Sequence, residues 1–132
     1  MSGDFFDTNV LVYLLSSDAA KAERAETRLR TGGAISVQVL NELTNVARRK
    51  LRMDWREIGE FLGTLRGLLD VVPLTVETHD LGLRLAERYG LSTYDSMICA
   101  AATLAGCDRL WSEDMQDGMR IGAELRVENP FG

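Results

Sequence analysis

The sequence contains few of the residues on which disulfide-rich, zinc-binding and membrane proteins depend. It has two cysteines, Cys99 and Cys107, in 132 residues, and two thiols cannot make a disulfide framework or a complete zinc site. Its longest apolar runs fall far short of the roughly 20 residues that a membrane helix needs. Residues 1–7 carry neither a basic leader nor a small-residue cleavage site. We therefore expect a soluble, cytoplasmic protein with no membrane segment.

The overall composition is typical of one folded domain. The chain has a mass of 14.7 kDa, and 45% of its residues are hydrophobic and 27% are charged. A chain of this size and composition builds one hydrophobic core. We expect a single domain over residues 1–132, with the two cysteines as small buried apolar residues.

The net charge of −5, from 15 basic and 20 acidic residues, does not suggest a nucleic-acid-binding protein. The basic residues are unevenly distributed, however, and one group of five surrounds a single acid, Asp54: Arg48, Arg49, Lys50, Arg52 and Arg56. Two interpretations stay open. The group forms a track for RNA phosphates, carried chiefly by Arg48, Arg49 and Arg52, or it is a solvated helix end, where cations are favoured.

Strand and helix patterns alternate along the chain. Short apolar segments predict strands at 5–6, 34–36, 70–74, 109–112 and 125–127, and periodic segments predict helices at 19–30, 37–50, 54–69, 76–89 and 92–105. Asp18 and Asp54 are typical helix N-caps, and Gly90 is a typical C-cap. Because no Asn-Gly or Asp-Gly hairpin links adjacent strands, the pattern indicates an α/β fold around a mostly parallel sheet.

Acidic residues fall where such a sheet places its reactive site, just beyond the carboxyl ends of the strands. Asp7 follows the first strand, and Glu42 lies on the helix after the second. Asp95 lies at the start of the predicted helix at 92–105, which is apolar on almost all sides. Glu113 and Asp114 follow the strand at 109–112. Carboxylates gathered in one cleft repel one another unless a cation joins them, and Mg²⁺ and Mn²⁺ prefer oxygen ligands. The placement favours a divalent-metal site.

Each acid also has a structural interpretation. Asp7 is a good helix N-cap, Asp95 fits a capping box with Ser92, and Asp114 suits a turn. Glu42 is harder to explain in this way, because it borders the apolar stripe of its helix, where an unpaired glutamate is costly.

Four segments resemble the motifs of the PIN domain family, and in particular its bacterial VapC-type toxins. They are residues 7–15 (DTNVLVYLL), 39–43 (VLNEL), 91–102 (LSTYDSMICAAA) and 110–115 (LWSEDM). The resemblance spans nearly the whole chain. It implies a three-layer α/β domain in which helices flank a short, mostly parallel central sheet.

The resemblance also implies a function. The family is known for Mg²⁺- or Mn²⁺-dependent ribonucleases, many of them toxins held inactive by a cognate antitoxin, and its members commonly form homodimers. By position, Asp7, Glu42, Asp95 and Asp114 match the acidic metal-binding quartet. The supporting positions are Asn9 and Ser112, with Asp117 as an additional or alternative outer acid. A metal held there would activate a water for in-line attack on an RNA phosphodiester.

Two other functions compete with this one. A haloacid-dehalogenase-like phosphatase needs a second Asp two positions after its nucleophile, and Asn9 stands there. A PIN-like module that binds RNA or protein without cutting usually lacks one or more acids, and all four are present here. For a homodimer, we expect the helix at 55–69 to present Phe61, Leu62 and Leu65 on one face.

Overall fold

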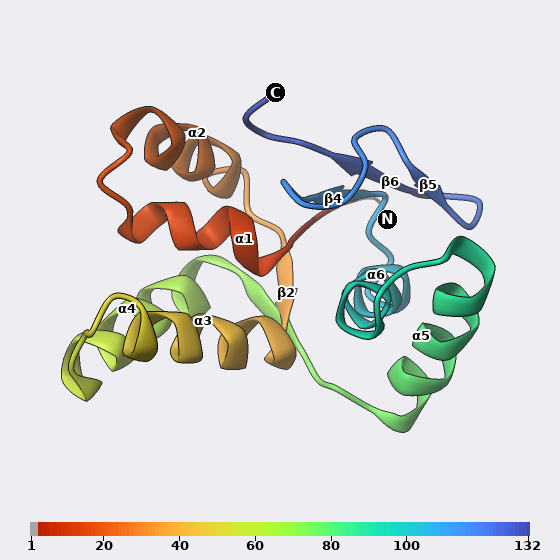
Figure 1. The fold of residues 1–132 in the computed structure, drawn as a ribbon, viewed down its shortest axis with the longest axis horizontal. Helices are drawn as coiled ribbons and strands as arrows, with labels where there is room; N and C mark the ends of the chain where they lie inside the picture. Colours follow the sequence, from red (N-terminus) through yellow and green to blue (C-terminus); the bar gives the residue numbers. More distant parts are fainter. Residues whose placement is uncertain (1–2) are drawn as a thin grey trace.

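The computed structural model describes residues 3–132 and contains alternating strands and helices along the chain (Figure 1). The elements are β1 (Asp4–Phe6), α1 (Thr8–Leu11), a 3₁₀ helix η1 (Val12–Leu15), α2 (Ala19–Leu29), β2 (Ala34–Ser36), α3 (Val37–Arg49), α4 (Trp55–Leu68), β3 (Asp70–Val72), α5 (Val76–Tyr89), α6 (Thr93–Leu104), β4 (Arg109–Trp111), β5 (Arg120–Ile121) and β6 (Leu125–Glu128).

The predicted helix-capping residues cap their helices in the structure. The carboxylate of Asp18 accepts a hydrogen bond from the Lys21 amide at the start of α2, and Asp54 and Glu57 form a complete capping box on α4. Gly90 ends α5 in the left-handed conformation, with φ of 68°. These contacts satisfy backbone groups at the helix ends, so they fix where each helix begins or stops.

The strands form one sheet in the order β3-β2-β1-β4-β6-β5, and every pairing is parallel except that of β5 with β6. The mostly parallel sheet is therefore confirmed. The antiparallel β5–β6 pair is a hairpin that the sequence patterns do not predict, because β5 is not among the expected strands. Its turn begins at Gly122, whose φ of 64° supplies the left-handed conformation without an Asn-Gly or Asp-Gly pair.

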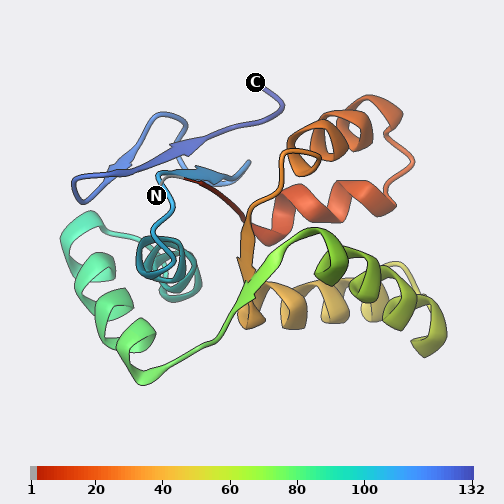
Figure 2. The ribbon, with the colours of Figure 1, turned by 180° about the vertical axis from the view of Figure 1, so that it is seen from behind.

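Helices cover the sheet on both sides, which completes the three-layer α/β architecture. Figures 1 and 2 show α5 and α6 together on one side of β2, and α1 to α4 on its other side. The apolar helix α6 is central, because it contacts both β2 and β6 and is covered by α5. Gly82 allows α5 to approach closely, since a Cβ there would lie 2.4 Å from the Met97 sulfur. Cys99 and Cys107 are free and buried, as expected.

The apolar face of α4 packs against the core of its own domain. Leu65 is buried in the core, and Phe61 and Leu62 pack against it. The expectation that these three side chains form an exposed face is wrong, because Leu65 is buried and Phe61 and Leu62 are partly buried; α4 itself contacts α3 and β3. None of the helices within residues 3–132 combines the length and the hydrophobicity needed to cross a membrane.

Candidate active site

A pocket of about 870 Å³ opens at the carboxyl ends of β1 and β4, where these two strands lie side by side. The strand order reverses between β1 and β4. After β1 the chain adds β2 and β3 on one side of β1, and it then places β4 on the other side. This is where α/β sheets place their ligands. All four acids predicted from the sequence line the pocket, together with Asn9 and Glu113: Asp7, Glu42, Asp95 and Asp114.

Asp7 forms the floor of the pocket and is held by three donors. Its Oδ1 accepts a hydrogen bond from the Thr8 amide at 2.7 Å, which makes it the N-cap of α1. Its Oδ2 accepts from the Ser112 hydroxyl at 2.9 Å and from the Asn9 amide nitrogen at 3.1 Å. A carboxylate has about four acceptor positions. Asp7 can therefore cap α1 and still present an oxygen lone pair to the pocket.

The charge of Asp7 is poorly stabilised in this position. The side chain is 4% exposed, and burial raises its pKa to about 7, with Asp95 and Glu42 adding repulsion. The hydrogen bonds from Ser112 and Thr8 lower the pKa but do not offset burial. A cation beside Asp7 would remove this penalty, because an opposite charge favours the ionised carboxylate.

Glu42 reaches the pocket from α3 and is also oriented by hydrogen bonds. The Thr8 hydroxyl donates to its Oε1, and the Gln38 side-chain amide donates to its Oε2 at 3.4 Å. Gln38 also donates to the Tyr94 carbonyl at 3.2 Å, which connects α3 to the start of α6. This network explains how a half-buried glutamate is tolerated beside an apolar stripe.

Asp95 and Asp114 complete the acidic lining. The Asp95 amide donates to the Ser92 hydroxyl at 3.3 Å, so its backbone takes part in capping α6 while its carboxylate lines the pocket. Asp114 is exposed and also lines the pocket. Asp117 does not line it, and instead accepts a hydrogen bond from the Asn129 amide at 2.9 Å. This placement favours Asp114 over Asp117 as the outer acid.

The carboxylate oxygens around the pocket are suitable ligands for a hard cation, although they do not form a closed coordination site. Within residues 3–132, no three His, Cys, Asp or Glu side chains are gathered tightly enough to hold a metal ion. The pocket offers carboxylate oxygens and a buried acid whose pKa is raised by burial and by like charges. Mg²⁺ and Mn²⁺ take such oxygens and retain several waters, so they do not need an all-protein cage.

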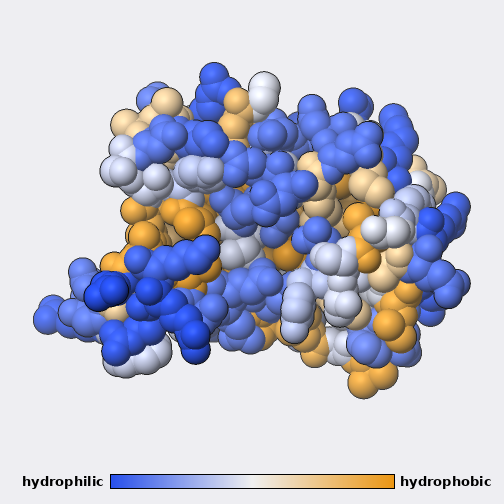
Figure 3. Space-filling view, in the orientation of Figure 1, coloured by the Kyte–Doolittle hydropathy of each residue, from blue (hydrophilic) through white to orange (hydrophobic). Residues whose placement is uncertain are grey.

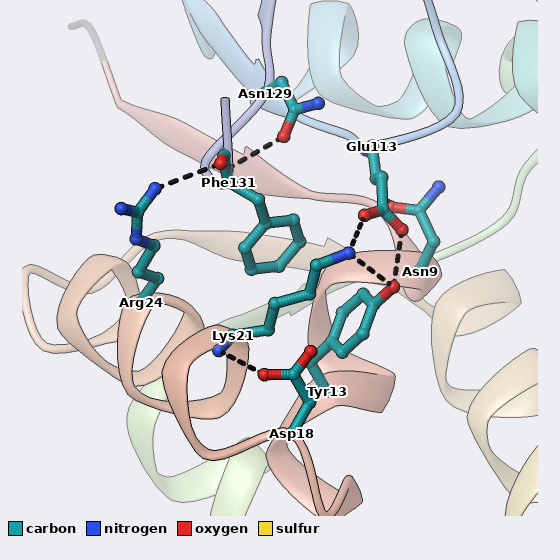
Figure 4. Close-up of polar contacts among 8 residues, drawn as sticks. All are labelled: Asn9, Tyr13, Asp18, Lys21, Arg24, Glu113, Asn129 and Phe131. Carbon is teal, nitrogen blue, oxygen red and sulfur yellow. Dashed lines mark hydrogen bonds and ion pairs between the residues drawn. The ribbon is translucent and has the colours of Figure 1, made fainter.

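Glu113 is the one acid of the predicted strand-end group that is already neutralised (Figure 4). Its carboxylate accepts from Lys21 Nζ at 2.7 Å and from the Tyr13 hydroxyl at 2.8 Å. The bond to Lys21 is the main reason why the pKa of Glu113 lies below its usual range. Its amide donates to Asn9 Oδ1 at 3.0 Å. Glu113 therefore fixes the loop after β4 and the orientation of Asn9.

The C-terminal segment reinforces this arrangement, as Figure 4 shows. The Phe131 ring packs edge-on against Tyr13, with ring centroids 4.8 Å apart, and Lys21 Nζ lies 5.2 Å from its centroid. Arg24 on α2 donates to the Phe131 carbonyl at 3.0 Å. The chain end is thereby attached to the elements that orient Asn9.

The predicted RNA-binding arginines lie outside the pocket lining. Arg48 donates to the Met53 carbonyl at 3.1 Å, and its guanidinium stacks on Trp55 at 4.7 Å. Arg49 and Arg52 are exposed near the end of α3. Lys50, from the same basic group, does line the pocket.

Sequence reasoning missed the residues that support the acids. Thr8, Gln38 and Lys21 act through side-chain contacts, two of which join distant parts of the chain. Only Thr8 carried a signal, because it stands beside Asp7 in the first motif.

The fold and the pocket define an α/β domain with an acidic site at the carboxyl edge of its sheet. The chain belongs to the PIN domain family, whose model matches residues 5–117. No curated protein gives a significant sequence match.

Solved structures resemble most of the chain. A toxin–antitoxin complex from Klebsiella pneumoniae aligns with a TM-score of 0.75 and 22% identity, covering 96% of this chain and 97% of that one. DNA-bound VapBC from Salmonella typhimurium aligns with a TM-score of 0.68 and 20% identity, covering 98% of this chain and 99% of that one. VapC20 from Mycobacterium tuberculosis, described as a sarcin-ricin-loop-cleaving toxin, aligns with a TM-score of 0.68 and 18% identity. The alignment covers 84% of this chain and 89% of that one. At these identities the likeness shows a shared fold.

Proposed function

We propose that this protein is a divalent-cation-dependent endoribonuclease that hydrolyses RNA phosphodiester bonds. The observation that carries the proposal is that Asp7, Glu42, Asp95 and Asp114, from four separate segments, line one pocket at the carboxyl edge of the sheet. Membership of the PIN family and the fold shared with a sarcin-ricin-loop-cleaving toxin support it. The cation is Mg²⁺ or Mn²⁺, since the available ligands are oxygens.

Asp7 and Asp95 would contact the cation directly, with Glu42 and Asp114 completing the shell or binding through water. A divalent cation supplies a water of lowered pKa and offsets negative charge on the phosphate. Ser112, Asn9 and the Thr8 amide keep the Asp7 carboxylate in a fixed orientation. Thr8 and Gln38 do the same for Glu42. Asp7 and Glu42 are therefore oriented before RNA arrives, which reduces the rearrangement needed for reaction.

The biological role that fits best is the toxin of a type II toxin–antitoxin pair. The similar structures include a toxin–antitoxin complex and two assemblies, VapBC and FitAB, bound to DNA. We propose a cognate antitoxin as a protein partner, a homodimer as the assembly and the cytoplasm as the location. Arg48, Arg49 and Arg52 would contact RNA phosphates or the antitoxin outside the pocket.

Replacing Asp95 by Asn is expected to abolish metal-dependent RNA cleavage. The substitution keeps the side-chain size but removes a negative charge from the pocket, so we expect the cleavage rate to fall by at least about a hundredfold. The measurement is incubation of total RNA with the parent and the variant in Mn²⁺ or Mg²⁺, and again in EDTA.

The matched control is Asp80→Asn, which removes one exposed charge on α5, away from the pocket. It should cut like the parent. Discrete cuts by the parent that persist in EDTA, or equal cutting by Asp95→Asn, would refute the proposal. RNA binding without any cleavage by the parent would instead identify a non-catalytic PIN module.

A further inference from the structure

Five carboxylates but only one cation line the pocket, within the part of the chain that the structure describes. The cation belongs to Lys50, and the carboxylates to Asp7, Glu42, Asp95, Glu113 and Asp114. RNA carries a negative charge on every phosphate, so the acids repel it unless cations offset them. We propose that Lys50 binds a phosphate of the RNA substrate next to the scissile bond, an inference that rests on the proposed nuclease function.

The end of α3 holds Lys50 at the pocket edge. Its amide donates to the Val46 carbonyl at 2.9 Å, and the Leu51 amide donates to the same carbonyl at 3.2 Å. The chain then turns sharply, because Arg52 adopts the left-handed conformation with φ of 54°. The Met53 amide closes the turn on the Ala47 carbonyl at 3.0 Å. The backbone of Lys50 is thus fixed, and only its exposed side chain needs to be ordered by a phosphate.

Two other cations of the same basic group, Arg48 and Arg56, make contacts elsewhere. Arg48 is held by the Met53 carbonyl and the Trp55 ring, and Arg56 pairs with Glu60 at 3.3 Å. A pocket-bound phosphate would therefore meet Lys50 rather than these arginines. The structure distinguishes members of a charge cluster that are equivalent in the sequence.

Part of the pocket wall is apolar. It includes Val46 and Leu51, neighbours of Lys50 in the chain, with Val12 and Leu15 from η1, while the polar residues Ser16, Ser17 and Asn45 also line the pocket. Figure 3 shows an apolar hollow in this region, with strongly hydrophilic side chains along its lower edge, over the C-terminal end of α3. Apolar walls lower the local dielectric constant, which strengthens the attraction between an ammonium group and a phosphate. A phosphate seated against this wall would gain more from Lys50 than from a fully solvated lysine.

Replacing Lys50 by Gln tests the inference through RNA affinity. The probe is a short fluorescein-labelled oligouridylate, and its Kd is measured by anisotropy in Mg²⁺ for proteins carrying Asp95→Asn, so that the probe is not cut. We expect Lys50→Gln to raise the Kd roughly tenfold, as loss of a charge-assisted hydrogen bond does. The slope of log affinity against log salt should become shallower by about 0.7, the value for one single-strand phosphate contact.

Two controls separate the local contact from a general charge effect. Arg84→Gln removes the same charge from an exposed position on α5 and should change the Kd by less than about twofold, because salt screens remote charges. Lys50→Arg should bind like the parent, since it keeps a cation. Thermal unfolding of each variant checks that the fold is retained.

The outcomes separate this inference from the function on which it rests. If the parent cuts RNA and Lys50→Gln binds the probe as Arg84→Gln does, the Lys50 contact is refuted and the nuclease stands. Equal loss of affinity in Lys50→Gln and Lys50→Arg would also refute a charge contact. If the parent neither binds nor cuts RNA, the proposed function fails and the inference fails with it.

Discussion

The free energy of unfolding of the metal-free protein is expected to fall by about 4 kcal/mol through Asp7 alone as the pH rises from roughly 4 to 8. The cause is the pKa of this buried carboxyl, which rises from 3.8 to about 7 on folding. A shift of about three units, at 1.36 kcal/mol per unit, gives this order of magnitude.

The sign follows from which state holds the proton more tightly. Below the unfolded pKa of 3.8, Asp7 is protonated in both states and carries no penalty. Between 3.8 and about 7, the unfolded chain releases the proton and the folded chain keeps it, so stability falls. Above the folded pKa, both states are ionised and the full penalty remains.

The Asp7→Asn variant removes the titration of Asp7 itself, together with its repulsion of Asp95 and Glu42, while groups remote from Asp7 titrate equally in both proteins. The variant should be more stable than the parent at pH 8 in EDTA, and the difference should shrink toward pH 4. Saturating Mn²⁺ should stabilise the parent at pH 8 and leave the variant nearly unchanged. The measurement is urea unfolding at several pH values, and parallel stability curves for the two proteins would contradict the account of Asp7.

Gly33→Ala is expected to destabilise the protein by about 3 kcal/mol or more, because two penalties combine at this position. Gly33 has φ of 143°, which a residue with a side chain rarely adopts. A Cβ there would also lie 2.6 Å from the Asp4 carbonyl oxygen and 2.9 Å from the Phe6 ring. Since Gly33 leads directly into β2, the strain would also displace the start of α3 and hence Glu42.

Gly32→Ala is the matched control for the close contact. Gly32 also has a positive φ, 81°, but a Cβ at this position would meet no atom within 4 Å. We expect a loss of only about 1 kcal/mol, from the left-handed conformation alone. Urea unfolding of both variants measures the difference, and equal losses would show that the approach of β1 to residue 33 is not tight.

The parts of the fold that depend on neighbouring residues could be predicted from the sequence. Asp18, Asp54 and Gly90 lie within a few residues of the backbone groups they satisfy. The ends of these helices could therefore be predicted from the local sequence. β5 was missed because it has two residues and no alternating pattern. Its place in the sheet comes from pairing with β6, a contact that the local sequence does not specify.

The acids of the site could be predicted, whereas their supports could not. Asp7 and Ser112 are 105 positions apart, and the parallel pairing of β1 with β4 brings them together. The rule for strand ends anticipates this meeting for any such sheet. No comparable rule pairs Lys21 with Glu113, or separates Lys50 from Arg48, because those contacts depend on how helices pack. Likewise, the direction of Phe61 on α4 became known only from the fold.

The central claim is that the acids of the pocket hold a divalent cation, and anomalous scattering from Mn²⁺-soaked crystals tests it most directly. The account predicts a peak in the pocket within ligand distance of the Asp7 and Asp95 carboxylates, with Glu113 still paired to Lys21. Asp117 should remain bonded to the Asn129 amide, away from the ion. A fully soaked crystal with no peak in the pocket, or with its peak at Asp117, would contradict the account.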